Sequence, residues 1–139
     1  QGFLWLATEN GLHRYDGWYS QGGRLDEAAA LLARDLDEIH AAYGKPMAIT
    51  EFGADTSAGF HAEPPVMWSE EYQAEMLRRY LDVAAERPWM VGMHVWNLTD
   101  FQTCQGILRA EGLNQKGVFT RDRRPKMAAH MLRKRWAGV

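Results

Sequence analysis

The sequence predicts an α/β fold in which strands and helices alternate along a chain of 139 residues. Two short apolar runs, Met47–Thr50 and Trp89–Trp96, are typical of strands. Helical periodicity comes before the first run, between the two and after the second. This alternation favours a parallel sheet or a barrel over an antiparallel sheet. With the apolar run at Gly2–Ala7, three strands are expected in this alternation, too few to close a barrel, and the length suits a single domain.

A β-hairpin is expected at the start of the chain. Residues Gly2–Ala7 form an apolar run, and the Asn-Gly pair within Thr8–Gly11 is a strong hairpin signal. Residues 12–17 would then form the return strand and the turn after it. Residues 18–23 are predicted to be a loop.

The first helix is predicted over Leu25–Tyr43, where apolar residues recur every three or four positions. Gly44 stands where a helix often ends, and Pro46 cannot extend the helix. The residues expected on its buried face are Leu25, Ala28, Leu32, Leu36, Ile39 and Tyr43.

Two more helices are expected. The second begins after Ser69, a suitable N-cap, and ends at Arg87–Pro88; the third opens at Pro125. Their expected buried residues are Tyr72, Met76, Tyr80 and Val83 in the second and Met127, Met131 and Trp136 in the third. The run Trp89–Trp96 is so apolar that a strand covered on both faces is expected. Long irregular segments over 54–68 and 97–120 are of the kind that often carries function.

Composition excludes several functional classes. A formal net charge of −2 gives no electrostatic case for a nucleic-acid or anionic-membrane partner, and no apolar run of membrane-spanning length is present. The single cysteine, Cys104, cannot form an internal disulfide, which suits a reducing compartment, so a cytoplasmic location is expected. The five histidines lack metal-site spacing and no phosphate-binding or dinucleotide glycine pattern occurs, so neither metal nor cofactor is expected.

Glu51 is the leading candidate for catalysis, because it lies at the end of the strand Met47–Thr50 and parallel α/β proteins place their chemistry at strand C-termini. From this stretch alone, a glutamate that pairs with an arginine or faces solvent is the simpler interpretation. Three further clusters follow predicted strands and would share the same face of a parallel sheet. They are Trp96 with Asn97 and Asp100, Arg109 with Asn114 and Lys116, and the aromatic group Tyr15–Tyr19.

A carboxylate nucleophile suits glycoside hydrolysis, which also requires a second carboxylate as acid/base. The positional candidates for that second group are Asp16, Asp55, Glu63 and Asp100, none with a supporting pattern. The side chains of Arg109, Asn114 and Lys116 together suit an anionic group on a substrate. A solvated, mildly basic loop is the alternative interpretation of these three residues.

Five stretches resemble the β-glucuronidases of glycoside hydrolase family 2. They are Ile49–Thr56, Met67–Gln73, Val95–Phe101, Gln105–Arg109 and Asn114–Lys126. The similarity covers roughly Arg14 to Trp136. It implies a retaining glycosidase on a (β/α)8 TIM barrel, of which this chain would be the C-terminal third and therefore incomplete.

The resemblance also implies roles for individual residues. Glu51 matches the nucleophile of the family's Thr-Glu-(Tyr/Phe)-Gly motif. Asn114 and Lys116 match the Asn-x-Lys motif that holds the carboxylate of β-D-glucuronide substrates. The other matched pocket residues are Arg109, Trp96, Tyr19 and Tyr15.

Two departures from the family pattern matter. No Asn-Glu pair that would supply the acid/base is present, so the alternative is a catalytically inactive, carbohydrate-binding or interaction fragment. Residues 1–17 match the family less well than residues 18–139, and resemble one blade segment of a β-propeller. We therefore expect a hairpin-like segment at 1–17, barrel sequence over 18–139, and a longer parent protein that forms a homo-oligomer.

Overall fold

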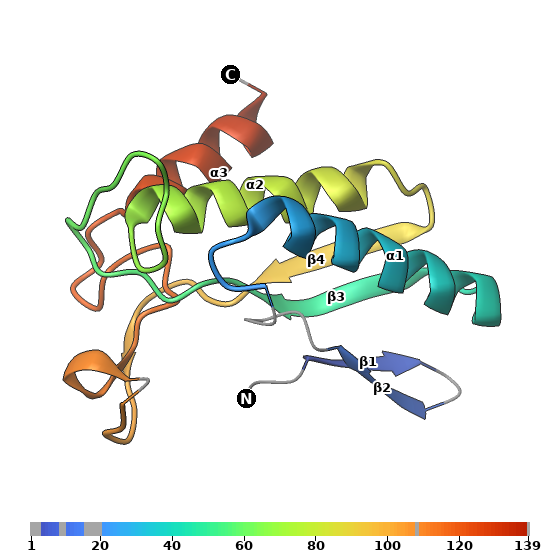
Figure 1. The fold of residues 1–139 in the computed structure, drawn as a ribbon, viewed down its shortest axis with the longest axis horizontal. Coiled ribbons are helices and arrows are strands. Elements are labelled where there is room, and N and C mark those ends of the chain that lie inside the picture. The colour runs from blue at the N-terminus through green and yellow to red at the C-terminus, as the bar shows by residue number, and fades with distance from the viewer. Residues whose placement is uncertain (1–3, 9–10, 16–20, 108, 139) are drawn as a thin grey trace. The chain divides into compact units, whose positions relative to one another are not determined.

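A computed structural model describes residues 4–8, 11–15, 21–107 and 109–138 (Figure 1). The chain divides into two compact units. The first unit holds the described residues up to Phe52 together with Arg79–Val95, and the second holds Gly53–Arg78 and the described residues from Trp96 onward. The boundary at Arg78 and Arg79 falls within a helix, so that helix contributes residues to both units.

The predicted hairpin is confirmed. Strands β1 (Leu4–Thr8) and β2 (Gly11–Tyr15) pair antiparallel, and Thr8 lies opposite Gly11. The remaining residues of the predicted turn, Glu9 and Asn10, lie outside the described residues.

Helix α1 (Leu25–Tyr43) has the predicted bounds. Gly44 ends it in a left-handed conformation with φ of 60°, and its N–H donates to the His40 carbonyl at 2.7 Å. Glycine adopts this conformation without steric cost, which explains why the helix stops there. Ala28, Leu32 and Leu36 form the buried face.

Strands β3 (Met47–Phe52) and β4 (Met90–Val95) pair in parallel, which confirms the expected parallel α/β arrangement. The pairing extends from Met47 with Met90 to Phe52 with Val95. Strand β3 is longer than predicted by two residues, so Glu51 lies inside the strand near its C-terminal end.

Within the described parts of this chain, β4 is not covered on both faces, contrary to the prediction. The Val91 side chain is 71% exposed, and no residue of the strand is fully buried. Within the described residues β4 pairs with β3 alone, so an apolar run that would suit a central strand lies at a sheet edge.

Helix α1 is attached to residues 79–95 of the first unit by polar and aromatic contacts. The Arg87 guanidinium donates to both carboxylate oxygens of Asp37, at 2.8 and 2.7 Å, and Arg79 pairs with Asp26. The His40 ring stacks on Trp89 with centroids 4.2 Å apart. Among the residues whose burial the structure describes, from 21 onward, the apolar ones buried in this unit are Ala28, Leu32, Leu36, Met47, Ile49, Phe52 and Tyr80.

Helix α2 (Glu70–Ala85) begins as predicted, because the Ser69 hydroxyl accepts the Tyr72 N–H at 3.1 Å and so caps its first turn. Tyr72, Met76 and Tyr80 are buried as expected, and Val83 is half-buried.

Helix α3 (Met127–Ala137) forms where expected, but its predicted buried face is wrong. Ala128 and Leu132 are buried, whereas Met127 is 42% and Trp136 is 65% exposed. Ala128 and Leu132 are one helical turn apart, on a stripe about 100° around the helix from Met127 and Met131. The large apolar side chains of α3 therefore do not mark its buried face.

The irregular segments of the second unit contain short pieces of regular structure. Strands β5 (Phe101–Gln102) and β6 (Leu113–Asn114) pair antiparallel, and a 3₁₀ turn covers Ala110–Gly112. Thr56 forms an isolated bridge with Trp68, which closes the segment between β3 and α2. Over the part of the chain that the structure describes, no helix has the length and apolar character needed to span a membrane.

Candidate active site

Ten polar or charged residues are buried in the described parts of the chain, and all of them lie in the second unit. They are Asp55, Thr56, Ser69, Glu70, Gln73, Asp100, Asn114, Gln115, Lys116 and Lys126. Most of them come from the segments that follow β3 and β4 and from residues 114–116. Buried polar groups need partners, so the contacts among these residues define the site.

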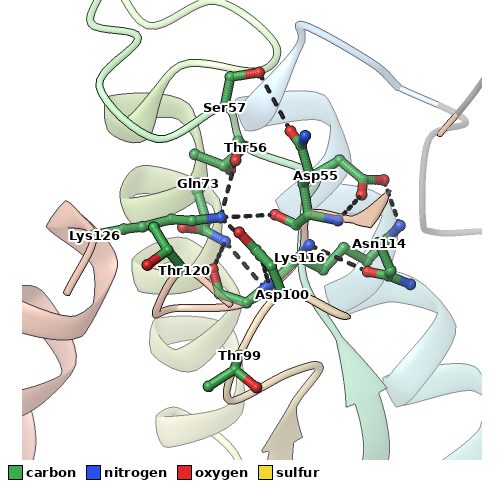
Figure 2. Close-up of polar contacts among 12 residues, drawn as sticks. Asp55, Thr56, Ser57, Gln73, Thr99, Asp100, Asn114, Lys116, Thr120 and Lys126 are labelled. Atoms are coloured by element: carbon green, nitrogen blue, oxygen red, sulfur yellow. Dashed lines mark hydrogen bonds and ion pairs between the residues drawn. The ribbon is translucent and has the colours of Figure 1, made fainter. Parts of the chain in front are cut away.

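Asp55, Arg109, Asn114 and Lys116, which we call the Asp55 group, come together in this unit (Figure 2 shows three of them). The Asp55 carboxylate pairs with the Lys116 ammonium through Oδ2. Its Oδ1 accepts the Gln115 N–H at 3.0 Å and lies 3.6 Å from Arg109 Nη1. The Asn114 side chain accepts the Lys116 N–H at 3.2 Å. The structure thus places the three predicted anion-binding residues together and adds a carboxylate between Lys116 and Arg109.

Burial lowers the pKa of Lys116, because removing the ammonium group from water disfavours its charge. The Asp55 carboxylate opposes this effect, and the positive charge of Arg109 adds to it. Two cations beside one carboxylate leave a local excess of positive charge. A bound anion at this place would therefore favour the charged form of Lys116.

A second buried ion pair joins Lys126 to Asp100 at 2.9 Å. The same ammonium group donates to the carbonyl oxygens of Thr56 at 2.9 Å and Gln115 at 3.0 Å, as the dashed lines around its nitrogen in Figure 2 show. Asp100 Oδ1 also accepts the Gly117 N–H at 2.9 Å. Burial raises the pKa of Asp100 and lowers the pKa of Lys126, and their ion pair opposes both shifts. This pair connects the segments after β3 and β4 with residues 115–117.

Gly117 is required by close backbone approach. A Cβ atom at this position would lie 2.2 Å from the Asp100 nitrogen and 2.5 Å from the Phe119 oxygen, distances that backbone atoms cannot relieve. Gly53 is similar, because its Cβ would lie 2.1 Å from the Trp96 carbonyl oxygen. Both glycines allow main-chain segments to touch beside the Asp55 group.

The other predicted site residues fall elsewhere. Glu51 is half-buried on β3 in the first unit, four positions before Asp55 in the chain. Trp96 directly follows β4, belongs to the second unit and packs edge-on against Phe101 with centroids 6.0 Å apart. Tyr15 is the last residue of β2, and Tyr19 lies outside the described residues. Of the predicted clusters, Arg109, Asn114 and Lys116 are the three residues that the structure brings into one group.

Residues that could hold a metal ion do not cluster in the described ranges: no set of three His, Cys, Asp or Glu side chains is suitably placed. Cys104 is exposed. The two cations and the amide of the Asp55 group are of the kind that binds anions through charge-assisted hydrogen bonds.

Sequence reasoning missed the roles of Gln73, Lys126 and Asp55. Gln73 is fully buried on α2 beside Tyr72 and Leu77, and a polar residue on an apolar helix face is a signal that could have found it. Lys126 precedes a helix, where periodicity gives no information. The position of Asp55 after β3 suggests only an acid/base role, whereas the structure places its carboxylate between Lys116 and Arg109.

Comparison with known proteins gives one consistent result. The profile of the glycosyl hydrolases family 2, TIM barrel domain, matches residues 6–139. A β-glucuronidase of Paenibacillus borealis is 49% identical over 125 residues, covering 90% of this chain and 21% of that protein. The human β-glucuronidase is 43% identical over 128 residues, covering 90% of this chain and 19% of that protein.

Solved structures agree. A β-D-glucuronidase of Dictyoglomus thermophilum superposes with a TM-score of 0.84 at 48% identity, covering 91% of this chain and 22% of that one. A Bifidobacterium dentium β-glucuronidase, solved with coumarin-3-O-glucuronide, gives a TM-score of 0.84 at 50% identity, covering 91% and 20%. The chain spans about a fifth of the length of the relatives that it matches.

These matches confirm the expected fold class, part of an α/β TIM barrel, whereas the division of the chain at residue 17 stays a prediction. The parallel β3–β4 pair and the helices between and beside its strands are the elements that a piece of such a barrel contains. The chain belongs to the glycosyl hydrolases family 2, TIM barrel domain.

Proposed function

We propose that this chain supplies the nucleophile and the carboxylate-binding residues of a retaining β-glucuronidase. The observation that carries the proposal is the Asp55 group, in which the Lys116 and Arg109 cations lie beside the buried Asp55 carboxylate and the Asn114 side chain accepts the Lys116 N–H. Similarity to β-glucuronidases at 40–49% identity over 90% of the chain supports the same conclusion. Because the chain spans about a fifth of those relatives, the activity is proposed for the whole protein that contains it.

The proposed mechanism assigns separate tasks to two parts of the chain. Glu51, near the C-terminal end of β3, attacks the anomeric carbon and forms a glycosyl-enzyme, which water then hydrolyses. A second carboxylate acts as acid and then as base. Lys116, Asn114 and Arg109 bind the carboxylate of the sugar through charge-assisted hydrogen bonds, which separates glucuronides from neutral glycosides. Trp96, Tyr15 and Tyr19 are proposed to line the sugar pocket.

Asp55 is proposed to hold the Lys116 side chain in place until a substrate binds. Its contacts with the Lys116 ammonium and the Gln115 N–H fix both the side chain and the backbone beside it. A group held in this way loses little conformational freedom when the substrate arrives. A cytoplasmic location and a homo-oligomeric parent protein stay predictions.

Replacement of Glu51 by Gln in the complete protein tests the nucleophile. Hydrolysis of a chromogenic β-glucuronide is expected to fall by at least about a thousandfold, because the amide cannot form the glycosyl-enzyme. The same exchange at the exposed Glu86 of the first unit is the control and should leave turnover unchanged. Full turnover by Glu51→Gln would contradict the assignment.

Replacement of Lys116 by Met tests carboxylate recognition. Loss of a charged hydrogen bond of about 1.5–3 kcal/mol is expected to raise KM for the glucuronide by about 10- to 100-fold. Any hydrolysis of the matching β-glucoside, in which CH2OH replaces the carboxylate, should change much less. Equal losses on the two substrates would show that Lys116 does not recognise the carboxylate.

A further inference from the structure

The main chain from Gln115 to Val118 is held by groups that come from other segments. The Gln115 carbonyl accepts the Thr56 N–H at 3.0 Å as well as the Lys126 ammonium. The Lys116 carbonyl accepts the Asn97 N–H at 3.1 Å, and the Val118 N–H donates to the Asn97 carbonyl at 3.0 Å. Because this segment is neither helix nor strand, these contacts replace a regular hydrogen-bond ladder.

Gln73 supports the same segment from α2. Its Nε2 lies 3.2 Å from the Lys116 carbonyl oxygen, 3.1 Å from that of Gly117 and 3.2 Å from that of Ala54. Its Oε1 is buried without a hydrogen-bond partner among the described residues. Gln73 thus connects the Lys116–Gly117 backbone with the segment that follows β3.

The Lys126 ammonium group is a second point where separate segments meet. Its three N–H groups match its three acceptors, the carbonyls of Thr56 and Gln115 and the carboxylate of Asp100. A glutamine amide offers two N–H groups, and an arginine presents a planar fork in place of a tetrahedral donor. The site is fully buried, so only a group with this donor geometry satisfies all three acceptors.

We propose that Lys126 is a positioning residue, whose ammonium group fixes the Gln115 backbone so that Asn114 and Lys116, on either side, are presented to the substrate carboxylate. This inference rests on the proposed function. Lys126 does not contact the substrate in this scheme, because its donors are used within the protein. It acts through Gln115, which lies between Asn114 and Lys116, the two residues proposed to bind the substrate carboxylate.

Electrostatics agrees with a positioning role. Asp100 is the acid in direct contact with Lys126, and Glu70 and Asp55 act on it from further away. Asp100 in turn accepts the Gly117 N–H, so one ion pair holds both ends of the Gln115–Gly117 segment. Removing the ammonium group would leave two carbonyls and a buried carboxylate without this donor.

The test compares Lys126→Met with Lys134→Met in the complete protein. Lys134 is exposed on α3, so it is a matched control for the loss of one lysine. We expect Lys126→Met to raise KM for a chromogenic β-glucuronide by about 10- to 100-fold, as for a displaced binding group, with a much smaller change in kcat. Lys134→Met should match the wild type. Kinetic constants for Lys126→Met equal to those of Lys134→Met, or a loss confined to kcat, would overturn the proposal.

Hydrogen exchange provides a readout that does not require turnover. Amides of Gln115–Val118 are expected to exchange faster in Lys126→Met, while those of β3 keep their wild-type rates. If Lys126→Met does not fold, the double variant Lys126→Met/Asp100→Asn removes the unpaired charge and keeps an acceptor for the Gly117 N–H. Unchanged exchange at 115–118, or failure of both variants to fold, would refute a local positioning role. A wild type without glucuronidase activity would refute the proposed function alone, and the exchange rates would still decide this inference.

Discussion

The first and second units bury different kinds of side chain. In the first unit, the fully buried side chains that the structure describes are apolar and come from α1, β3 and the end of α2. In the second unit, ten buried polar or charged residues lie among buried apolar ones. Paired strands and helices satisfy their own backbone groups, so their side chains can be apolar. In the irregular segments of the second unit, the side chains of Gln73, Asp100 and Lys126 provide hydrogen-bond partners for backbone groups.

The two units also hold their proposed functional residues in different ways. The apolar unit holds Glu51 on strand β3, where the register with β4 shifts between Ile49 and Phe52, whereas the proposed carboxylate-binding residues lie on backbone fixed by side chains. Regular structure places a residue by its ladder, and irregular structure places it by individual hydrogen bonds. A single substitution should therefore affect the two units through different physical effects.

The largest effect is expected for Leu36→Ala in the first unit. Leu36 is buried on α1, and truncation of a buried leucine costs about 2–5 kcal/mol through lost burial and the cavity left behind. Urea unfolding measures the change. Asp37→Ala, the next residue, removes the exposed carboxylate of an ion pair with Arg87 and should cost less than about 1 kcal/mol. Equal effects of the two variants would show that apolar packing does not dominate this unit.

A smaller effect is expected for Gly117→Ala in the second unit. The added Cβ would lie between 2.2 and 2.5 Å from backbone atoms of Asp100, Phe119 and Thr99, so the segment must shift. Overpacking of this kind costs about 1–3 kcal/mol. Faster hydrogen exchange at residues 115–118 should accompany the loss. Gly106→Ala, where an added Cβ meets nothing within 4 Å, is the control. Wild-type stability in Gly117→Ala would disprove the close approach.

The smallest effect concerns the exposed contact between His61 Nδ1 and Glu71 Oε1, 2.7 Å apart. The hydrogen bond with the Glu71 carboxylate raises the pKa of His61. The contribution of His61 to folding stability is therefore present below its unfolded pKa of about 6.5 and is lost as pH rises through the higher folded pKa. The hydrogen bond from the Ala62 N–H, and to a smaller extent that with His61, lowers the pKa of Glu71. The contribution of Glu71 to folding stability is therefore present above its unfolded pKa of about 4.3 and is lost as pH falls through the lower folded pKa.

The contact should thus be strongest between about pH 4.3 and 6.5. An NMR titration of His61 measures this, with Glu71→Gln as the comparison. The midpoint of His61 should fall in the variant. A midpoint that does not move would exclude Glu71 as the cause.

Much of the first unit could be predicted from the sequence. Periodicity and Gly44 gave the bounds of α1, and the Asn-Gly pair gave the hairpin, because these signals are local. The burial of β4 and the face of α3 could not be predicted, since both depend on which neighbours cover them. Val91 is exposed although its strand is apolar, and Ala128 is buried although it is small.

The candidate site divides in the same way. Arg109, Asn114 and Lys116 were found from residue type and from the family resemblance. The roles of Asp55, Gln73 and Lys126 depend on partners far away in the sequence, and no local pattern indicates which carbonyl a buried donor will meet. A short stretch of a single sequence does not show which distant backbone group such a donor contacts.

The long sequence separations in the second unit have a consequence for folding order. Lys126 and Thr56 are 70 positions apart, and Glu70 joins Gly59 to the first residue of α3, Met127. Closing such loops costs chain entropy before the contacts form, so this unit should acquire its structure after the local hairpin and α1. During synthesis, the segment Asn114–Lys116 would remain unordered until Lys126 has emerged and reached its acceptors.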